Sequence, residues 1–189
     1  THYPIIVLLM ESKFNFKNFS IVIPIFNEEE ILEESTNAIF SLCKRMEIDF
    51  EIIFSENGST DKTKAIAEEL TNKHPEIKII SNPEPNYGNA LKTGFKIAKN
   101  DLVISFDIDY YSESFLSEAL KLESEYSGIT ASKRLGSSED GRRFIRRLAT
   151  NFFVILLKTL FGTKLSDTHG MKAIKKSEIE KFLPKVVST

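Results

Sequence analysis

Short apolar runs alternate along this chain with amphipathic segments. The runs are four to seven residues long, and their length and composition predict buried β-strands. The expected strands are Ser20–Phe26, Phe50–Ser55, Ile77–Ser81, Leu102–Phe106 and Gly128–Ala131. Between them lie helix-like segments near residues 28–46, 61–73, 88–99 and 113–126. Strands that alternate with helices predict an α/β fold, with a mostly parallel central sheet and helices on both faces.

The last third of the chain has a different pattern. A basic segment that contains Arg142, Arg143, Arg146 and Arg147 precedes the apolar stretch 151–161. This order predicts a long helix that is basic at its start and apolar afterwards. The apolar stretch is shorter than the roughly 20 residues that span a bilayer. Two interpretations remain open: a helix that lies in a membrane interface, or a core helix whose arginines face water.

The charge of the chain is divided unevenly between its two parts. Residues 1–131 hold 12 Lys/Arg and 22 Asp/Glu, a net charge of −10, whereas residues 132–189 hold 13 and 5, a net charge of +8. At 189 residues the chain is expected to form one domain, 1–189. We expect its basic part, 132–189, to face an anionic partner. Nucleotide phosphates, a lipid headgroup and nucleic acid all satisfy this on charge alone.

The single cysteine, Cys43, excludes an intrachain disulfide and a cysteine-based zinc cluster. It lies among apolar residues of a predicted helix, so we expect a buried structural thiol in a reducing compartment. The apolar run Tyr3–Met10 is too short to span a membrane. It also lacks the basic start and the small-residue cleavage site of a signal peptide.

Two carboxylates, Asp107 and Asp109, follow the predicted strand Leu102–Phe106. Because side chains alternate along a strand, both would point the same way past its carboxyl end. Open α/β sheets bind ligands at that edge. Hard oxygen ligands suit Mg²⁺ or Mn²⁺ held against a diphosphate. The pair therefore predicts a divalent-metal site, although Asp-x-Asp is also common in ordinary loops.

Strings with a recognisable order lie after three of the strands and at the start of the third helix. They are Pro24–Glu29, Ser55–Asp61, Asn86–Gly94 and the Asp107/Asp109 pair. Together they resemble the inverting family 2 glycosyltransferases of GT-A fold over roughly residues 20–135. The resemblance implies that a nucleotide sugar is bound by Pro24, Phe26, Glu28, Ser55, Asn57, Lys92 and Asp107. In this interpretation Asn57 stands at the position that recognises the nucleotide base, and Asp107 and Asp109 hold the metal.

The basic tail narrows the resemblance to polyprenyl-phosphate (dolichyl-phosphate) mannose and glucose synthases. The matching residues are Ser132–Arg134, the arginine cluster, Asn151 and the string Asp167–Lys172. The resemblance gives Arg134 a catalytic role beside Asp109. It also assigns the acceptor phosphate to Arg134, Arg143, Arg147 and Lys172. Tyr111 stands where the family commonly has a glutamine ligand, so His169 is our hypothesis for a third metal ligand.

The expected function is a metal-dependent transfer of a hexose from GDP-mannose or UDP-glucose to a polyprenyl phosphate. Such an enzyme would be peripheral at the cytoplasmic face of a membrane, and nucleic acid is not an expected partner. Two alternatives remain open. One is a family 2 enzyme with a saccharide acceptor, and the other is a nucleotide-sugar-binding domain without catalysis.

Overall fold

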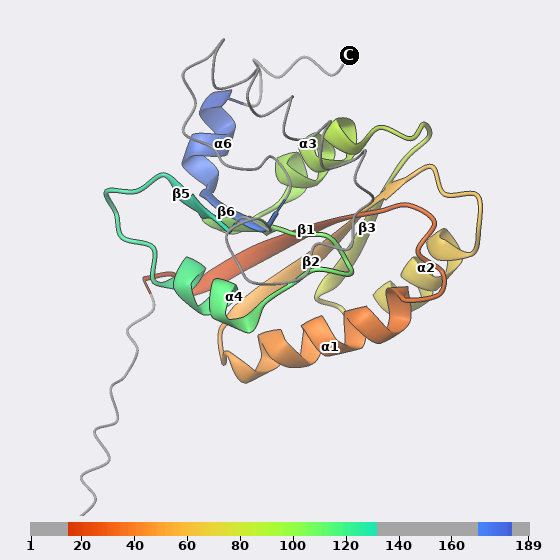
Figure 1. Ribbon diagram of the computed structural model, residues 1–189, viewed down its shortest axis with the longest axis horizontal. Coiled ribbons are helices and arrows are strands. Elements are labelled where there is room, and N and C mark those ends of the chain that lie inside the picture. Colours follow the sequence, from red (N-terminus) through yellow and green to blue (C-terminus); the bar gives the residue numbers. More distant parts are fainter. Residues whose placement is uncertain (1–14, 132–169, 183–189) are drawn as a thin grey trace, which may run out of the picture.

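A single mixed β-sheet forms the centre of the protein (Figure 1). The computed structural model describes residues 15–131 and 170–182. In these residues six strands lie in the order β3-β2-β1-β4-β6-β5. Helices α3 and α6 lie on one face of the sheet, and α1, α2 and α4 lie on the other (Figure 1). The predicted α/β arrangement is therefore confirmed.

The first four strands are parallel to one another. Their bounds are β1 (Asn18–Ile25), β2 (Asp49–Asn57), β3 (Ile77–Asn82) and β4 (Leu102–Ser105). Strand β1 is central, because it pairs with β2 along one edge and with β4 along the other. Residues 19–25 of β1 are all buried, as expected for a parallel strand that helices cover on both faces.

The other side of the sheet is antiparallel and was predicted only in part. Strand β5 (Gly128–Thr130) was expected, but β6 (Lys172–Lys175), which lies between β4 and β5, was not. Strand β6 pairs antiparallel with both neighbours. Its sequence places only Ala173 and Ile174 between lysines, so it lacks the apolar run of the other strands. The unpaired backbone groups along the edge of β4 supply its hydrogen bonds.

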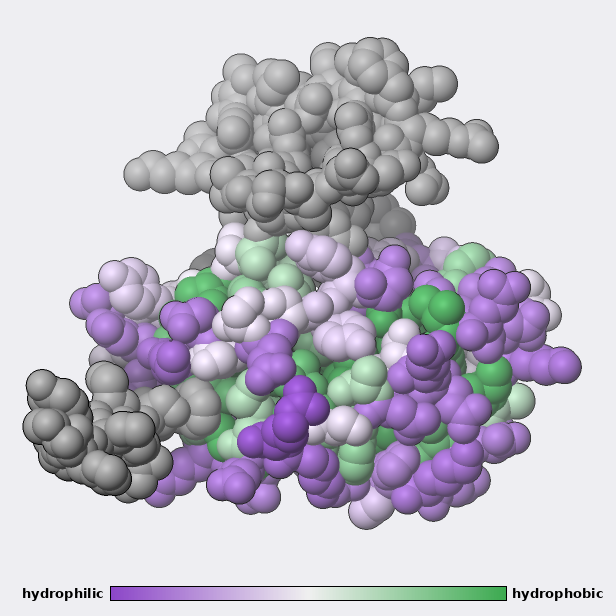
Figure 2. All heavy atoms as spheres, turned by 60° about the horizontal axis from the view of Figure 1, so that its bottom comes forward, coloured by the Kyte–Doolittle hydropathy of each residue, from purple (hydrophilic) through white to green (hydrophobic). Residues whose placement is uncertain are grey.

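Two apolar layers join the helices to the sheet. Alternate residues of β1 face opposite layers: Ile21 and Ile23 pack in the larger core, and Val22 packs in the smaller one. The larger core lies under three helices, which are α1 (Leu32–Arg45), α2 (Thr63–Lys73) and α4 (Glu113–Leu120). The smaller lies under α3 (Tyr87–Ile97) and α6 (Lys176–Phe182). The face that carries α1 is largely hydrophilic on its outside (Figure 2).

The predicted bounds agree with the structure closely for the strands and less closely for two helices. Helix α1 begins at Leu32, because the residues before it form a turn in which the N–H groups of Ile31 and Leu32 both donate to the carbonyl of Glu28. Helix α4 ends at Leu120 and not near residue 126. Beyond it, the ammonium of Lys175 satisfies the carbonyls of Glu123 and Ser124. The helix expected over the basic and apolar segment lies outside the described residues.

Candidate active site

The candidate site lies at the point where the order of the parallel strands reverses. From β1 the chain moves outward through β2 to β3, and then returns to the other side of β1 to form β4. Such a reversal opens a crevice at the carboxyl ends of the two central strands. The segment that contains Phe26 and Glu28 follows β1, and the segment that contains Asp107 and Asp109 follows β4. The structure thus brings these four predicted residues to one edge of the sheet.

Hydrogen bonds from side chains fix the loop after β1 against the loop after β2. Asn27 has a left-handed backbone with φ of 54°, and its Oδ1 accepts the N–H of Thr60 at 2.9 Å. The N–H of Glu28 donates to the Thr63 hydroxyl at 2.7 Å. The ring of Phe26 beside them is 40% exposed, which is unusual for phenylalanine. A fixed and accessible aromatic surface at this edge can stack against a planar ligand.

Three carboxylates approach one another across the crevice. The N–H of Tyr110 donates to the carbonyl of Asp107 at 2.9 Å and closes a turn. Ile108 is buried in this turn, while Asp109 is exposed and Asp107 is half-buried. Burial and the negative charges of Asp109 and Asp107 raise the pKa of Glu28 above its ordinary value. The site is therefore a concentration of negative charge that a cation would relieve.

The described residues fit a divalent metal only if a ligand completes the site. In the described part of the chain, no group of three or more His, Cys, Asp or Glu side chains is arranged to hold a metal ion. Mg²⁺ and Mn²⁺ bound with nucleotides commonly take one or two protein carboxylates and complete their coordination with phosphate oxygens and water. Asp107 and Asp109 match that partial set of ligands.

Tyr87, at the start of α3, contacts this acidic cluster. Its hydroxyl donates to Oδ1 of Asp107 at 3.1 Å, although the side chain is 48% exposed. Partial burial of the phenol, the charge of Asp107 and this hydrogen bond raise the pKa of Tyr87 above its ordinary value, so the phenol stays a donor. Sequence reasoning missed Tyr87, although it lies inside the recognised string Asn86–Gly94. Lys92 lies on the same helix and is half-buried.

Other predicted nucleotide-sugar contacts are buried within the sheet. Pro24 is buried in β1 and lies opposite Ser55 of β2. The Ser55 hydroxyl is fully buried and donates to the carbonyl of Ala90 at 2.6 Å. Asn57 is 6% exposed, and its Oδ1 accepts the N–H of Asn86 at 2.7 Å. The side chains of Ser55 and Asn57 therefore support α3, whereas Phe26, Glu28, Asp107 and Asp109 retain accessible surface.

The antiparallel strands bring Lys172 to the same edge of the sheet. Lys172 begins β6 and lies opposite Ser105, the last residue of β4. Its ammonium donates to the carbonyl of Gly170 at 3.2 Å. The N–H of Ala131 donates to the carbonyl of Met171 at 2.9 Å, so the described residues that flank 132–169 lie side by side here. The other predicted phosphate and metal contacts, Arg134, Arg143, Arg147 and His169, lie outside the described residues.

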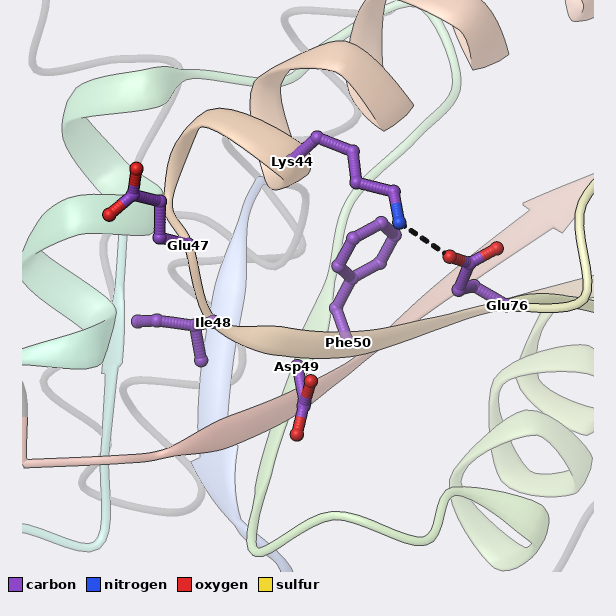
Figure 3. Close-up of a pocket in the computed structure, with 6 residues that line it drawn as sticks. All are labelled: Lys44, Glu47, Ile48, Asp49, Phe50 and Glu76. Atoms are coloured by element: carbon purple, nitrogen blue, oxygen red, sulfur yellow. Dashed lines mark hydrogen bonds and ion pairs between the residues drawn. The ribbon is translucent and has the colours of Figure 1, made fainter.

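A surface pocket lies at the opposite edge of the sheet, where β2 begins. Figure 3 shows Lys44 extending over the ring of Phe50 to the carboxylate of Glu76. The ammonium lies 5.5 Å from the ring centroid and 2.6 Å from Oε1 of Glu76. These contacts connect α1 to the sheet at the amino ends of the strands, far from the candidate site.

A known protein family matches this chain across the crevice. The model of the family described as glycosyl transferase family 2 matches residues 20–183. This match covers most of the chain, including described residues 20–131 and 170–182. The chain belongs to glycosyl transferase family 2. The resemblance inferred from the loop strings is thereby confirmed at the level of the family.

Two curated relatives of this family 2 glycosyltransferase carry the same name, undecaprenyl-phosphate 4-deoxy-4-formamido-L-arabinose transferase. The protein from Proteus mirabilis (strain HI4320) is 37% identical over 150 residues, which cover 78% of this chain and 45% of the relative. The protein from Pectobacterium carotovorum subsp. carotovorum (strain PC1) is 36% identical over 157 residues, covering 81% and 47%. The chain therefore spans about half the length of the curated relatives it matches.

Solved structures confirm the GT-A fold of the family 2 domain. A mannosyltransferase from Pyrobaculum calidifontis, solved with GDP-Man and Mn²⁺, has a TM-score of 0.61 and 18% identity, covering 90% of this chain and 48% of that one. Glucosyl-3-phosphoglycerate synthase from Mycobacterium tuberculosis, solved with Mn²⁺, UDP and phosphoglyceric acid, has a TM-score of 0.62 and 22% identity, covering 85% and 56%. At this identity the likeness concerns the fold alone.

Among the described helices of this family 2 domain, none is long and apolar enough to cross a bilayer. The longest, α1, has 14 residues.

Proposed function

We propose that this protein is a metal-dependent glycosyltransferase that moves a sugar from a nucleotide sugar to the phosphate of a polyprenyl lipid. The observation that carries the proposal is the convergence of Glu28, Asp107 and Asp109 on the crevice between β1 and β4. Membership in glycosyl transferase family 2 gives this acidic cluster a chemical context. The names of the relatives, which include undecaprenyl phosphate, support the lipid acceptor.

In this proposal Asp107 and Asp109 hold Mg²⁺ or Mn²⁺ against the donor diphosphate. The bound ion would stabilise the charge that develops on the departing nucleotide diphosphate. Phe26 would support the base by stacking, and Glu28 would accept hydrogen bonds from the ribose or the base. Lys92 would contribute positive charge near the phosphates. We assign the roles of Pro24, Ser55 and Asn57 to support of these groups, because their side chains are buried.

The acceptor chemistry explains why no general base is required. A lipid phosphate is already anionic near neutral pH, so its oxygen can attack the anomeric carbon without losing a proton. The acceptor phosphate would be oriented by Lys172 and by arginines of the basic tail, namely Arg134, Arg143 and Arg147. Arg134 would also have the catalytic role proposed beside Asp109, and His169 remains our candidate for a third metal ligand.

The sugar is the least constrained part of the proposal. The resemblance to mannose and glucose synthases favours a hexose, whereas the curated relatives are named for a 4-deoxy-4-formamido-L-arabinose. Because the curated relatives at 36–37% identity are named for that sugar, we favour the amino-pentose class. The basic tail and the lipid acceptor also favour a peripheral location at the cytoplasmic face of a membrane.

The proposal can be tested by transfer of labelled sugar to undecaprenyl phosphate in anionic liposomes. The donors would be UDP- and GDP-linked sugars of both classes, each with and without Mn²⁺. We expect metal-dependent formation of a lipid-linked sugar, and we expect Asp109→Asn to abolish it. The matched control is Asp101→Asn, an exposed aspartate just before β4 at the opposite edge, which should retain activity.

Product that forms equally well without liposomes and with a free saccharide would instead support the alternative acceptor class. Nucleotide binding without any transfer would support a domain that lacks catalysis. Equal activity of Asp109→Asn and the control would contradict the proposed metal site.

A further inference from the structure

Hydrogen bonds of asparagine side chains join the ends of β2 and β3 to the start of α3, and we call this network the asparagine ladder. Asn57 and Asn82 are the last residues of the two strands and lie opposite each other in the sheet. Both are 6% exposed. The amide of Asn82 donates to the carbonyl of Glu56 at 3.1 Å. Its Oδ1 accepts the hydroxyl of Thr93, on the second turn of α3, at 3.2 Å.

Asn57 takes part in this ladder through its side-chain oxygen. Its Oδ1 accepts the backbone N–H of Asn86 at 2.7 Å. Asn86 is the N-cap of α3, and its own Oδ1 accepts the N–H of Asn89 at 2.9 Å. Asn57 thus holds the residue that caps the helix. The buried side-chain oxygen that could otherwise accept a hydrogen bond from a base faces the protein backbone.

The neighbouring carboxylate is also turned inward. Glu56 is 3% exposed, and its Oε1 accepts the N–H of Ser59 at 2.6 Å. Both acceptor side chains at the end of β2 are therefore engaged with backbone N–H groups. A buried N–H that loses its acceptor is costly, because it gives up water without gaining a partner.

The start of α3 links this ladder to the acidic cluster. Tyr87 follows Asn86 directly and donates to Oδ1 of Asp107 at 3.1 Å. In the sheet β2 and β4 lie on either side of β1. The contacts from Asn57 through Asn86 and Tyr87 to Asp107 therefore pass across the end of the central strand. A shift of Asn86 would move the phenol that contacts Asp107.

We propose that Asn57 is a positioning residue that fixes α3 over the donor site and does not contact the base of the nucleotide. The proposal rests on the proposed function for the existence of a donor site. It predicts that Asn57 affects every nucleotide equally, because it acts through the placement of α3. A residue that reads the base would instead alter the preference between bases.

The experiment compares the wild type with Asn57→Leu, Asn57→Asp and the control Asn72→Ala, an exposed asparagine in α2. Affinities for UDP, GDP and CDP are measured by calorimetry with Mn²⁺, and amide hydrogen exchange is followed at Asn86 and Asn89. In Asn57→Leu we expect exchange at these amides to be about tenfold faster or more, as loss of one buried acceptor predicts. All three nucleotides should weaken by the same factor.

Asn57→Asp keeps an acceptor oxygen and should fold even if Asn57→Leu does not. It should retain slow exchange and the wild-type ratio of the three affinities. A change of about tenfold or more in the ratio of UDP to GDP affinity, in either variant, would overturn the proposal. If the wild type binds none of the nucleotides, the proposed function fails. The positioning role is then tested by amide hydrogen exchange alone, and wild-type exchange rates in Asn57→Leu would refute it.

Discussion

Helix α3 contains Tyr87 and Lys92, which lie towards the candidate site. The helix packs close to the sheet at Gly94. A Cβ atom added at Gly94 would lie 2.3 Å from Cγ1 of Val22, a fully buried residue of β1. Carbon atoms pack best at about 3.5–4.0 Å, so the helix or the valine would have to move by about 1 Å. The substitution Gly94→Ala tests whether this close approach is real.

Two effects of opposite sign determine the result. Alanine in a helix interior is favoured over glycine by about 1 kcal/mol. Overpacking of a tight core costs about 1–3 kcal/mol, and a contact this short at a stiff, buried side chain belongs at the upper end. We therefore expect Gly94→Ala to lower the free energy of unfolding by about 2 kcal/mol. The sign itself is diagnostic, because the helix effect alone would stabilise the protein.

A double-mutant cycle with Val22→Ala separates the two effects. Without the valine methyls, the nearest atom is Cβ of residue 22 at 3.5 Å, an ordinary contact. In that background Gly94→Ala should be neutral or stabilise by up to about 1 kcal/mol. The expected coupling between the two positions is then about 2–3 kcal/mol. Val22→Ala alone should cost about 1.5–2 kcal/mol for two lost methyl groups.

The assay is urea unfolding followed by far-UV circular dichroism, because the chain has no tryptophan. Gly88→Ala is the matched control, since the nearest atom to a Cβ there is Oδ1 of Asn86 at 3.5 Å. It should be neutral or slightly stabilising. The steric argument is refuted if Gly94→Ala stabilises the protein, or if its effect is the same with and without Val22.

Three further results are expected. Glu51 is buried, yet hydrogen bonds from Lys78, the Lys99 N–H and Ser20 outweigh that burial and lower its pKa. Its ionised form therefore stabilises the fold above pH 4.5, and this stability is lost as the pH falls below that value. In acid titrations, Glu51→Gln should reduce this loss. Asp109→Asn should abolish the rise in melting temperature that Mn²⁺ and nucleotide give together, while leaving the metal-free melting temperature equal or higher, because it removes one charge that repels Glu28. Burial raises the pKa of Cys43 to about 12, so a thiol reagent should label it only at the rate of unfolding measured independently, and rapid labelling of the native protein would contradict its buried position.

The strands and the acidic edge were predictable because they depend on local pattern. Strands such as β1 and β4 are buried on both faces and are written as continuous apolar runs. Asp107 and Asp109 follow such a run directly, so their place at the carboxyl edge needs no knowledge of distant residues. Strand β6 has no such pattern. Strand β6 forms because the edge of β4 offers unpaired backbone groups, and this edge exists only once the sheet has assembled.

The sequence also did not predict that the side chain of Asn57 faces inward or that Tyr87 contacts Asp107. The motif fixes the position of Asn57 along the chain, but whether its oxygen faces a ligand or the N–H of Asn86 depends on how α3 packs. That packing depends in turn on Gly94 and Val22, which lie far apart in the sequence. The place of Asp107 and Asp109 at the carboxyl edge of the sheet was therefore predictable, whereas the partners that orient these and neighbouring side chains were not.

The place of β6 between β4 and β5 has a consequence for how the sheet assembles during synthesis. Among the described strands β5 pairs only with β6, and residues 170–182 are the last described part of the chain to leave the ribosome. The four parallel strands can pair as soon as β4 has emerged, but no other described strand pairs with β5 until β6 arrives. During that interval the edge of β4 is open to other strands. Among the described strands, the pairing of β6 is thus the last to form, and the same event places Lys172 opposite Ser105 at the end of β4.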